Sequence, residues 1–461
     1  MNKKIVILGA GPTGLGAAYR LKELGESDFV IYDKNAYAGG LATTFQDENG
    51  FWWDIGGHVQ FSHYKYFDDL MDKLLPNEWF DHQRESWVWM QDRWIPYPFQ
   101  NNIHRLPTEV MKECLNGLIE IYKNPKSYKP KNFKEWILQS LGEGIGKHFM
   151  FPYNFKVWAH DTAMMNTDWV GERAAVADLA RVTNNIIDSK DDVSWGPNNT
   201  FRFPKHGGTG EIWKRLAKEV GMENIQLNKT VKKVNTKEKE ITFEDGEKVK
   251  YEHLVSTIPV DKLVLMSDLG DEVKEATKKL LHSSTHIIGV GLEGKPSEEL
   301  STKCWMYFPE DNAPFYRTTL FSKYSPFNVP DIKKHFSLMM EVSESQYKPV
   351  NQATVVDEVV QGLKNTKLIN EKDKIVSRWY HREEYGYPTP SLERNDALKL
   401  IMPELMKRKI YSRGRFGMWK YEVSNQDHSM MQGVEVANFI VHGIPELTAW
   451  YPNVVNGPKP Y

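Results

Sequence analysis

Residues 5–14, IVILGAGPTG, decide the fold of this chain. The apolar run at 5–8 predicts a strand, and glycines at GxGxxG spacing predict a tight turn into a helix. A second apolar run at 29–32 ends in an acid, nineteen residues beyond the third glycine, where a parallel strand presents a carboxylate to ribose hydroxyls. Free N–H groups at the helix start suit a pyrophosphate. The predicted dinucleotide site comprises Gly9, Gly11, Pro12, Thr13, Gly14, Asp33 and Lys34.

A second glycine turn indicates which dinucleotide binds. Gly39 precedes Gly40, Leu41 and Ala42, shortly after the ribose acid, and residues 51–58 read FWWDIGGH. A nicotinamide dehydrogenase usually continues into further strand–helix repeats, whereas this unit is interrupted. Extra glycine turns let backbone lie alongside a large ring system. We therefore predict FAD, with Gly40, Leu41, Ala42, Gly56 and Gly57 beside it, and the family resemblance given below implies that His58 lies there as well.

Composition excludes several classes of protein. The chain has 461 residues with 59 Lys plus Arg and 61 Asp plus Glu, so its near balance of charge argues against a nucleic-acid-binding protein. Its two cysteines, Cys114 and Cys304, lie far apart and predict no metal or redox motif. No apolar run reaches transmembrane length, and residue 1 leads straight into the first strand. We expect a cytoplasmic protein without a membrane, nucleic-acid or metal partner.

The rest of the chain predicts two inserts. Helical spacing at 111–121, 133–141 and 170–182 indicates a helical insert, and residues 195–204 are expected to form a loop. Short strands between 224 and 258 return the chain to the first sheet. Strand-like runs at 286–290 and 338–342 indicate a further sheet.

The predicted fold class is α/β, with a discontinuous Rossmann-like FAD-binding domain, a helical insert domain and an antiparallel-sheet domain. We assign residues 1–80, 200–265 and 412–461 to the FAD-binding domain. Residues 105–199 form the helical insert domain, and the family resemblance given below implies that it is a substrate domain with a mobile flap. Residues 81–104 and 266–411 form the sheet domain, which completes the substrate site.

An ordered series of motifs resembles the eukaryotic-type UDP-galactopyranose mutases over nearly the whole chain. Compared with fungal members, the chain has a shorter segment at 330–336 and ends soon after Gly457, so the resemblance leaves the oligomeric state open. The motifs lie at 56–67, 96–103, 152–159, 195–204, 283–286, 304–317, 386–390 and 412–429.

The resemblance implies an isomerase that interconverts UDP-galactopyranose and UDP-galactofuranose through a reduced-FAD N5–sugar adduct. The nucleophile then belongs to the cofactor, which explains why the sequence offers no Ser/His/Asp set or carboxylate pair. Arg173 and Arg317 match the arginines that hold the diphosphate, since planar guanidinium groups donate paired hydrogen bonds. With His58, these arginines are the predicted catalytic residues. Tyrosines matching the same diphosphate are Tyr324, Tyr387 and Tyr421.

The resemblance also places the ends of both ligands. Tyr97, Gln100, Asn154 and Trp158 match the uridine and sugar end, with Asn198 on the flap and Tyr307 and Arg415 near the reacting centre. Val231, Asn425, Gln426 and Ser429 match contacts to FAD. Members of this family are reduced by NADPH, and Arg84 and Ser86 match the positions that hold its 2′-phosphate.

Three alternatives stay open at this point. An amine-oxidase or desaturase relative would share only the FAD fold, and two arginines directed at a diphosphate do not suit its substrates. A catalytically silent UDP-sugar-binding protein would keep the fold without the reaction. A mutase for a related UDP-sugar would differ at positions that the sequence does not identify.

Overall fold

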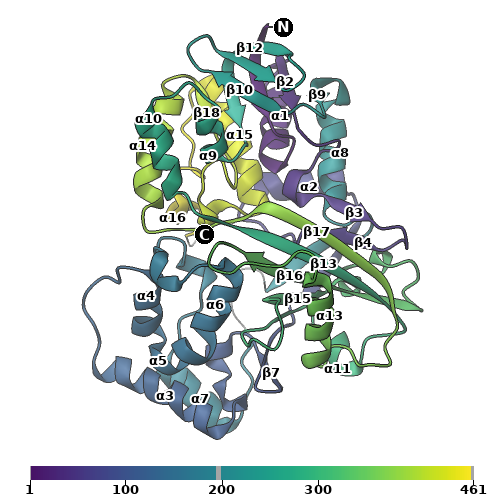
Figure 1. Ribbon diagram of the computed structural model, residues 1–461, viewed down its shortest axis with the longest axis vertical. Helices are drawn as coiled ribbons and strands as arrows, with labels where there is room; N and C mark the ends of the chain where they lie inside the picture. The colour runs from purple at the N-terminus through teal and green to yellow at the C-terminus, as the bar shows by residue number, and fades with distance from the viewer. Residues whose placement is uncertain (1, 194–198, 458–461) are drawn as a thin grey trace.

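The computed structural model describes residues 2–193 and 199–457, whose arrangement is shown in Figure 1. A body built from both ends of the chain lies at the top of the view, a long-stranded sheet crosses the middle, and a group of helices lies at the lower left. The fold is mixed α/β, and its nucleotide-binding unit is discontinuous. The predicted fold class is confirmed.

The first sheet gathers segments that are far apart in the sequence. Strand β1 pairs parallel with β2 on one side and with β12 on the other. Strand β18 pairs parallel with β12, so segments near the two ends of the chain share one sheet. The order is β10-β11-β12-β1-β2-β9, with β18 beside β12. The bounds are β1 Asn2–Leu8, β2 Phe29–Tyr32, β9 Ile225–Gln226, β10 Val231–Asn235, β11 Glu240–Phe243, β12 Lys248–Ser256 and β18 Ile410–Ser412.

Helices cover both faces of this sheet. Ile5 and Ile7 point into a core with α1, α2, α8 and α15, while Val6 and Leu8 face α9, α10 and α14. Parallel strands are usually buried in this way on both faces, which explains their unbroken apolar runs. The bounds are α1 Pro12–Glu23, α2 Lys65–Leu74, α8 Gly210–Val220, α9 Val260–Leu265, α10 Asp271–Ala276, α14 Arg394–Met406 and α15 Gln426–His442.

Helices α10 and α14 differ from the division of the chain made from the sequence, which assigned residues 266–411 to the sheet domain. Val273 and Ile401 are buried in the same core as Val6 and Leu8. Their apolar faces cover one side of the parallel sheet. Sequence spacing shows that a helix has an apolar face but not which sheet that face covers.

Helices α1 and α15 approach closely because each carries a glycine at the crossing. A Cβ atom at Gly16 would lie 2.7 Å from the backbone oxygen of Met430, and one at Gly433 would overlap the backbone oxygen of Thr13. The close approach holds α15 against the helix that follows the glycine turn.

The second sheet crosses the middle of Figure 1 in the order β17-β13-β16-β15-β14-β6-β7. All its pairs are antiparallel except β14 with β6. The strands are β6 Ser86–Met90, β7 Arg93–Pro96, β13 His282–Glu293, β14 Trp305–Tyr307, β15 Arg317–Leu320, β16 His335–Glu344 and β17 Ile375–Pro388. The helices near it are α11 Glu298–Ser301, α12 Phe321–Tyr324 and α13 Val355–Asn365.

The helical group at the lower left of Figure 1 corresponds to the predicted insert. Its helices are α3 Thr108–Lys123, α4 Phe133–Ser140, α5 Gly142–Ile145, α6 Phe151–Trp158 and α7 Leu179–Asp188. A short π-helix, Gly146–Met150, joins α5 to α6. The glycines of α5 permit its close packing, since a Cβ at Gly144 would overlap the backbone of Glu113 in α3.

Two local predictions are wrong. The helix expected at 170–182 is a short turn at Gly171–Arg173 followed by α7, whose start is capped by Asp178. The loop expected at 195–204 contains a strand, β8 Thr200–Pro204, which pairs with β5 Trp79–Gln83. Phe201 and Phe203 fill a core between the sheets, so the pairing depends on a segment more than 100 residues away.

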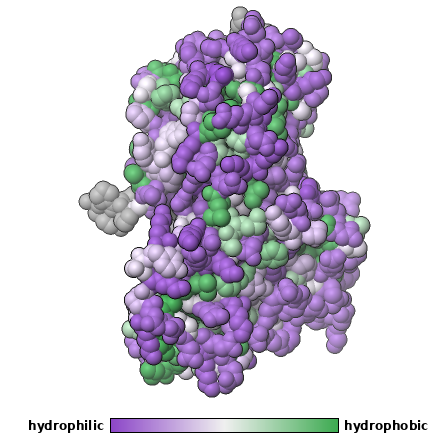
Figure 2. All heavy atoms as spheres, turned by 60° about the vertical axis from the view of Figure 1, so that its left-hand side comes forward, coloured by the Kyte–Doolittle hydropathy of each residue, from purple (hydrophilic) through white to green (hydrophobic). Residues whose placement is uncertain are grey.

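Figure 2 shows one face of the molecule, on which hydrophilic residues dominate and hydrophobic residues occur in small groups. Across the described ranges, none of the helices combines the length and the apolar character that crossing a membrane requires. The remaining elements are the hairpin β3 Thr44–Gln46 with β4 Trp52–Asp54, and α16 Pro452–Val455.

Candidate active site

The turn after β1 has the backbone that a dinucleotide requires. Gly9 has φ +105°, a conformation that side-chain-bearing residues rarely adopt, and a Cβ at Gly14 would overlap the Gly9 carbonyl oxygen. The bare backbone of Gly11 faces Gly40, since a Cβ placed on Gly11 would lie 3.8 Å from the Gly40 Cα. The Gly39 N–H donates to the Ala10 carbonyl oxygen at 2.8 Å, which brings the second glycine turn beside the first.

Asp33 closes this turn from the end of β2. Its Oδ2 accepts from the Ala10 N–H at 2.6 Å, and its Oδ1 accepts from the Asn35 N–H at 2.8 Å. Burial raises the pKa of Asp33, although these hydrogen bonds oppose the rise. The carboxylate keeps further lone pairs for a ribose. Lys34 is exposed beside it, and Val231 begins β10 nearby, since the Lys229 N–H donates to the Asp33 backbone oxygen.

His58 follows two glycines on the loop after β4. The Gly57 N–H donates to Glu341 Oε1 at 3.0 Å, which ties the loop to β16. The Nδ1 atom of His58 is buried and has no hydrogen-bond partner among the described residues. Burial lowers the pKa of His58 to about 4, with smaller effects from Arg415 and Arg317, so the ring is neutral near pH 7.

The first turn of α15 carries three of the predicted FAD contacts. Asn425 is the residue before the helix, and its side chain makes no capping bond. Gln426 accepts from Trp213 Nε1 at 2.8 Å, and the Ser429 hydroxyl donates to the Ser424 carbonyl oxygen at 3.4 Å. The helix therefore offers free N–H groups and a positive dipole end, which suit an electron-rich ring.

Arg317 lies at the start of β15 and is oriented by a carboxylate. Its Nε and an Nη donate to Glu341 at 2.7 and 2.8 Å. The Tyr316 hydroxyl donates to the same carboxylate at 2.7 Å. Burial opposes ionisation of Glu341, but attraction to Arg317 and these hydrogen bonds lower its pKa below the usual range. The sequence analysis missed Glu341, although a lone acid in the apolar run at 338–342 was a signal of it.

Arg173 and Arg415 lie over aromatic rings. The Arg173 guanidinium is 4.6 Å from the ring centre of Tyr421, and that of Arg415 is 4.9 Å from Tyr387. An Nη of Arg173 donates to the Glu422 backbone oxygen at 3.1 Å, while its buried Nε has no hydrogen-bond partner within the described ranges. The Nε of Arg173 is therefore available to an oxyanion, whereas Arg415 donates to the Gly386 carbonyl oxygen at 2.9 and 3.2 Å and to the Ser424 hydroxyl at 2.8 Å.

Predicted substrate residues form an aromatic wall beside the arginines. Tyr97 and Tyr307 have ring centres 5.2 Å apart, and Trp158 lies 4.8 Å from Tyr421 and 5.7 Å from Tyr387. Tyr153, which the sequence analysis missed, lies 5.3 Å from Tyr307. Its place on α6 beside Asn154 was a signal of its role.

The polar residues of this wall are bonded to backbone. Asn154 donates to the Met150 oxygen at 2.8 Å, and Gln100 donates to the Ala175 oxygen. Tyr324 packs between Phe201 and Phe203, with ring centres 5.3 and 5.2 Å away.

The two residues expected to recognise NADPH border the same wall. The Arg84 guanidinium lies 5.7 Å from the Tyr97 ring centre, and Arg84 is buried. Ser86 is also buried, and its carbonyl oxygen accepts from the Tyr97 N–H at 3.1 Å. Asn198, expected on the flap, lies outside the described residues.

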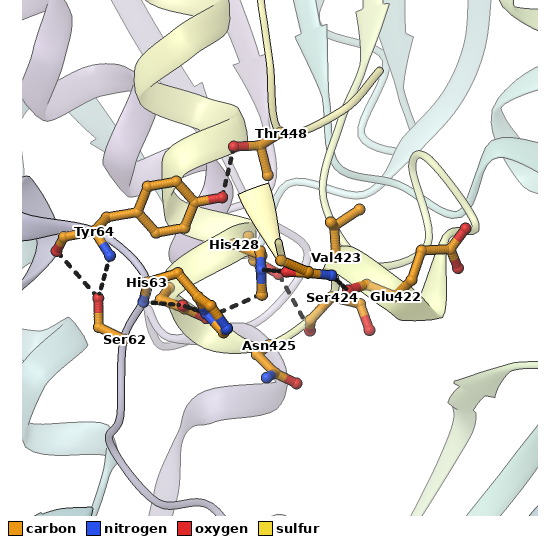
Figure 3. Close-up of polar contacts among 12 residues, drawn as sticks. Ser62, His63, Tyr64, Glu422, Val423, Ser424, Asn425, His428 and Thr448 are labelled. Atoms are coloured by element: carbon orange, nitrogen blue, oxygen red, sulfur yellow. Dashed lines mark hydrogen bonds and ion pairs between the residues drawn. The ribbon is translucent and has the colours of Figure 1, made fainter. Parts of the chain in front are cut away.

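A cluster of His63, Asp427 and His428 lies at the start of α15, and the sequence analysis did not detect it (Figure 3). His63 Nδ1 is 2.8 Å from Asp427 Oδ2, and His428 Nδ1 is 3.2 Å from Asp427 Oδ1. Burial opposes ionisation of Asp427, but the two histidines more than offset it, so its pKa lies far below the usual range. Residues 364 positions apart form the first of these pairs, which explains why no sequence motif reveals it.

Comparisons with known proteins agree with this geometry. A family model of flavin-containing amine oxidoreductases matches residues 12–411. A crystal structure of a reduced UDP-galactopyranose mutase superposes with a TM-score of 0.97 at 50% sequence identity, covering 100% of this chain and 98% of that one. The chain belongs to the UDP-galactopyranose mutase family. The predicted resemblance and a flavin cofactor are therefore confirmed, and this mutase is one branch of the wider oxidoreductase family.

More distant relatives match this chain in sequence or, for a solved structure, in fold. A probable flavin-containing monoamine oxidase A of Dictyostelium discoideum is 24% identical over 55% of this chain and 57% of its own length. A 15-cis-phytoene desaturase of Solanum lycopersicum is 25% identical over 58% and 48%. The chain thus spans about half the length of these curated relatives. A putative protoporphyrinogen oxidase of Exiguobacterium sp. has a TM-score of 0.72 at 16% identity, covering 95% of this chain and 98% of its own.

Proposed function

We propose that this protein is a flavin-dependent isomerase that interconverts UDP-galactopyranose and UDP-galactofuranose. The observation that carries the proposal is the full-length match, at 50% identity, to a reduced UDP-galactopyranose mutase. The site is compatible with that substrate, because Arg173 and Arg317 stand beside a wall of tyrosine and tryptophan rings.

The residues around the glycine turns fit FAD. Gly11 and Gly40 leave backbone bare for a pyrophosphate, and the unpartnered Nδ1 of His58 is available to a flavin ring. The start of α15 adds a positive dipole end. When bound and reduced, FAD supplies the nucleophile that the anomeric carbon of the sugar requires.

The two arginines would bind the diphosphate and stabilise the charge that grows on UDP as its bond to the sugar breaks. Arg317 is held by the Glu341 carboxylate, so its planar group is oriented before the substrate arrives. Arg173 is held more loosely, by the Glu422 carbonyl oxygen at 3.1 Å, by longer contacts of 3.4 and 3.5 Å to Asn425 Oδ1 and by the Tyr421 ring, and its Nε is available to a phosphate oxygen.

The tyrosines would serve as hydrogen-bond donors. Burial raises the pKa of Tyr387, against the opposing effect of Arg317, and burial likewise raises the pKa values of Tyr307 and Tyr324. Each hydroxyl therefore keeps its proton near pH 7, so Tyr324 and Tyr387 can donate to diphosphate oxygens and Tyr307 can donate near the reacting centre. The same rings, with Trp158, would exclude water from the reacting sugar.

We further propose that NADPH delivers the electrons. Arg84 and Ser86 support this assignment because they border the aromatic wall and Arg84 stacks on Tyr97, where a nucleotide would enter the same site as the sugar substrate. A guanidinium can pair with a 2′-phosphate, which NADH lacks.

Amine oxidation is not favoured, because the paired arginines suit a diphosphate and not an amine. The decisive experiment is anaerobic incubation of the purified protein with UDP-galactofuranose, with and without dithionite, followed by chromatography. We expect UDP-galactopyranose only after reduction. Conversion independent of flavin redox state would contradict the mechanism. If another UDP-sugar is converted and UDP-galactofuranose is not, the proposed substrate is wrong.

A further inference from the structure

Asn456, just beyond α16, contacts both the surroundings of Arg173 and the histidine cluster at the start of α15. Its Nδ2 donates to the Glu422 backbone oxygen at 2.8 Å, and its Oδ1 lies 2.7 Å from His428 Nε2. The Glu422 oxygen also accepts from Arg173 at 3.1 Å. One half-buried amide therefore contacts the acceptor of a diphosphate arginine and a fully buried histidine of α15.

The Glu422 oxygen is a fixed point. The Glu422 carboxylate pairs with the buried Arg394 at 2.8 and 2.9 Å, which anchors the residue. A carbonyl oxygen has two lone pairs. Here the oxygen accepts one hydrogen bond from Arg173 and another from Asn456. Arg173 also contacts Asn425 Oδ1 at 3.4 and 3.5 Å, but its shortest hydrogen bond is to an oxygen that it shares with an amide from the segment after α16.

The other end of the amide continues into the cluster of Figure 3. His428 faces Asp427 at 3.2 Å, and Asp427 in turn bonds His63 at 2.8 Å, on the loop that carries His58. The 3.2 Å contact between His428 Nδ1 and Asp427 Oδ1 is a buried ion-pair contact without hydrogen-bond geometry, so within the described ranges the Nε2 bond to Asn456 is the hydrogen bond that fixes the His428 ring.

A cavity of about 200 Å³ lies beside these contacts. Its lining includes Trp169, Arg173, Glu422 and Asn456, together with the start of α16. The segment after α15 therefore forms part of the surroundings of Arg173.

A bound metal is a different interpretation of the histidine cluster, since its three possible ligand atoms lie within 4.8 Å of one another. The 2.8 Å between His63 Nδ1 and Asp427 Oδ2 is a hydrogen-bond distance. The positive end of α15 also disfavours a cation and favours the carboxylate. Hydrogen bonding explains the geometry better than a metal.

We propose that Asn456 is a positioning residue that orients Arg173 through the Glu422 carbonyl oxygen and connects it, through His428 and Asp427, to the loop of His58. The proposal rests on the proposed function, because it assumes that Arg173 binds the diphosphate. Its consequence is that a residue from the end of the described chain sets affinity for UDP.

The test compares UDP binding to the oxidised holoprotein by calorimetry for wild type, Asn456→Ala and Asn456→Asp. We expect Asn456→Ala to weaken UDP binding about tenfold, the loss typical of a well-placed hydrogen bond. Asn456→Asp should weaken it similarly, because a carboxylate accepts from His428 but cannot donate to Glu422. The same two variants separate the Arg173 end of the network from the His428 end. FAD affinity, measured by flavin fluorescence, should fall for Asn456→Ala. It should stay close to wild type for Asn456→Asp.

Asn438→Ala is the matched control. It removes an amide from α15 that accepts from Arg20 at 2.8 Å, far along the helix from its first turn, and should leave UDP binding unchanged. Wild-type binding in both Asn456 variants, or equal losses in Asn438→Ala, would overturn the positioning role. Stoichiometric zinc in the purified protein would overturn the hydrogen-bonded cluster. Wild-type protein that binds no UDP would overturn the proposed function itself.

Discussion

The FAD side of the site and the substrate side are built in opposite ways. The FAD side depends on backbone within one short stretch, where Gly9, Gly11 and Gly14 shape a turn between β1 and α1. The substrate side is assembled from α6, β15, β17 and the segments before α15, and its residues are held by contacts between those elements. A side chain added to a glycine of the FAD side should prevent FAD binding. Removal of a single side chain from the substrate side should instead lower the activity by a graded amount.

Gly14→Val should have the largest effect, because the new side chain would overlap the Gly9 carbonyl oxygen and has no room to move. We expect protein without bound flavin or no folded protein, measured by the flavin absorbance of the purified fraction. Gly270→Ala is the control, since nothing lies within 4 Å of its added Cβ. A flavin-replete Gly14→Val protein would show that the turn does not govern FAD binding.

Arg317→Ala should have the second-largest effect. We expect turnover to fall about a hundredfold or more while FAD remains bound. The change removes a positive charge from beside the diphosphate and leaves Glu341 without its partner next to Gly57, but it leaves the turn at Gly9, Gly11 and Gly14 unchanged. Steady-state rates on dithionite-reduced enzyme measure it, and Arg378→Ala, which breaks an exposed pair with Asp357, is the control. Unchanged turnover would exclude Arg317 from the reaction.

Glu341→Gln should produce a smaller loss, about tenfold in kcat/KM. The amide still accepts from Tyr316 or Arg317 but no longer carries the charge that orients the guanidinium. If Glu341 acts only through Arg317, the double variant with Arg317→Ala should be no slower than Arg317→Ala alone. Additive losses would indicate a separate role for the carboxylate.

Arg84→Ala should affect one half-reaction only. We expect flavin reduction by NADPH to slow by about tenfold, followed by stopped-flow absorbance, because a charge pair with the 2′-phosphate is lost. Dithionite-reduced enzyme should turn over as wild type does. Loss of both activities together would mean that Arg84 supports the wall at Tyr97 instead.

The sequence was informative where chemistry is local and uninformative where contacts are long-range. The glycine turn, the strand after it and the arginines are each recognisable in a few residues. The strand at 200–204 is not, because it exists through pairing with β5, and the helix expected at 170–182 is interrupted near Arg173. Asp427 and Asn456 belong to no sequence motif. Asp427 contacts His63, and Asn456 contacts His428, only once the chain has folded.

His58→Gln should have the smallest effect, which is on the pH dependence of the free energy of unfolding. The variant tests whether the loop after β4 belongs to the buried FAD side. Its pKa is lowered to about 4 by burial, against about 6.5 in an unfolded chain. Between these values the unfolded state binds a proton that the folded state excludes, so the free energy of unfolding decreases as pH falls from 6.5 to 4. Urea titrations across this range should show a shallower decrease for His58→Gln than for wild type. An unaltered decrease would mean that His58 has the same pKa in the folded and the unfolded protein, as a solvated ring has, and the loop would then belong with the adaptable substrate side.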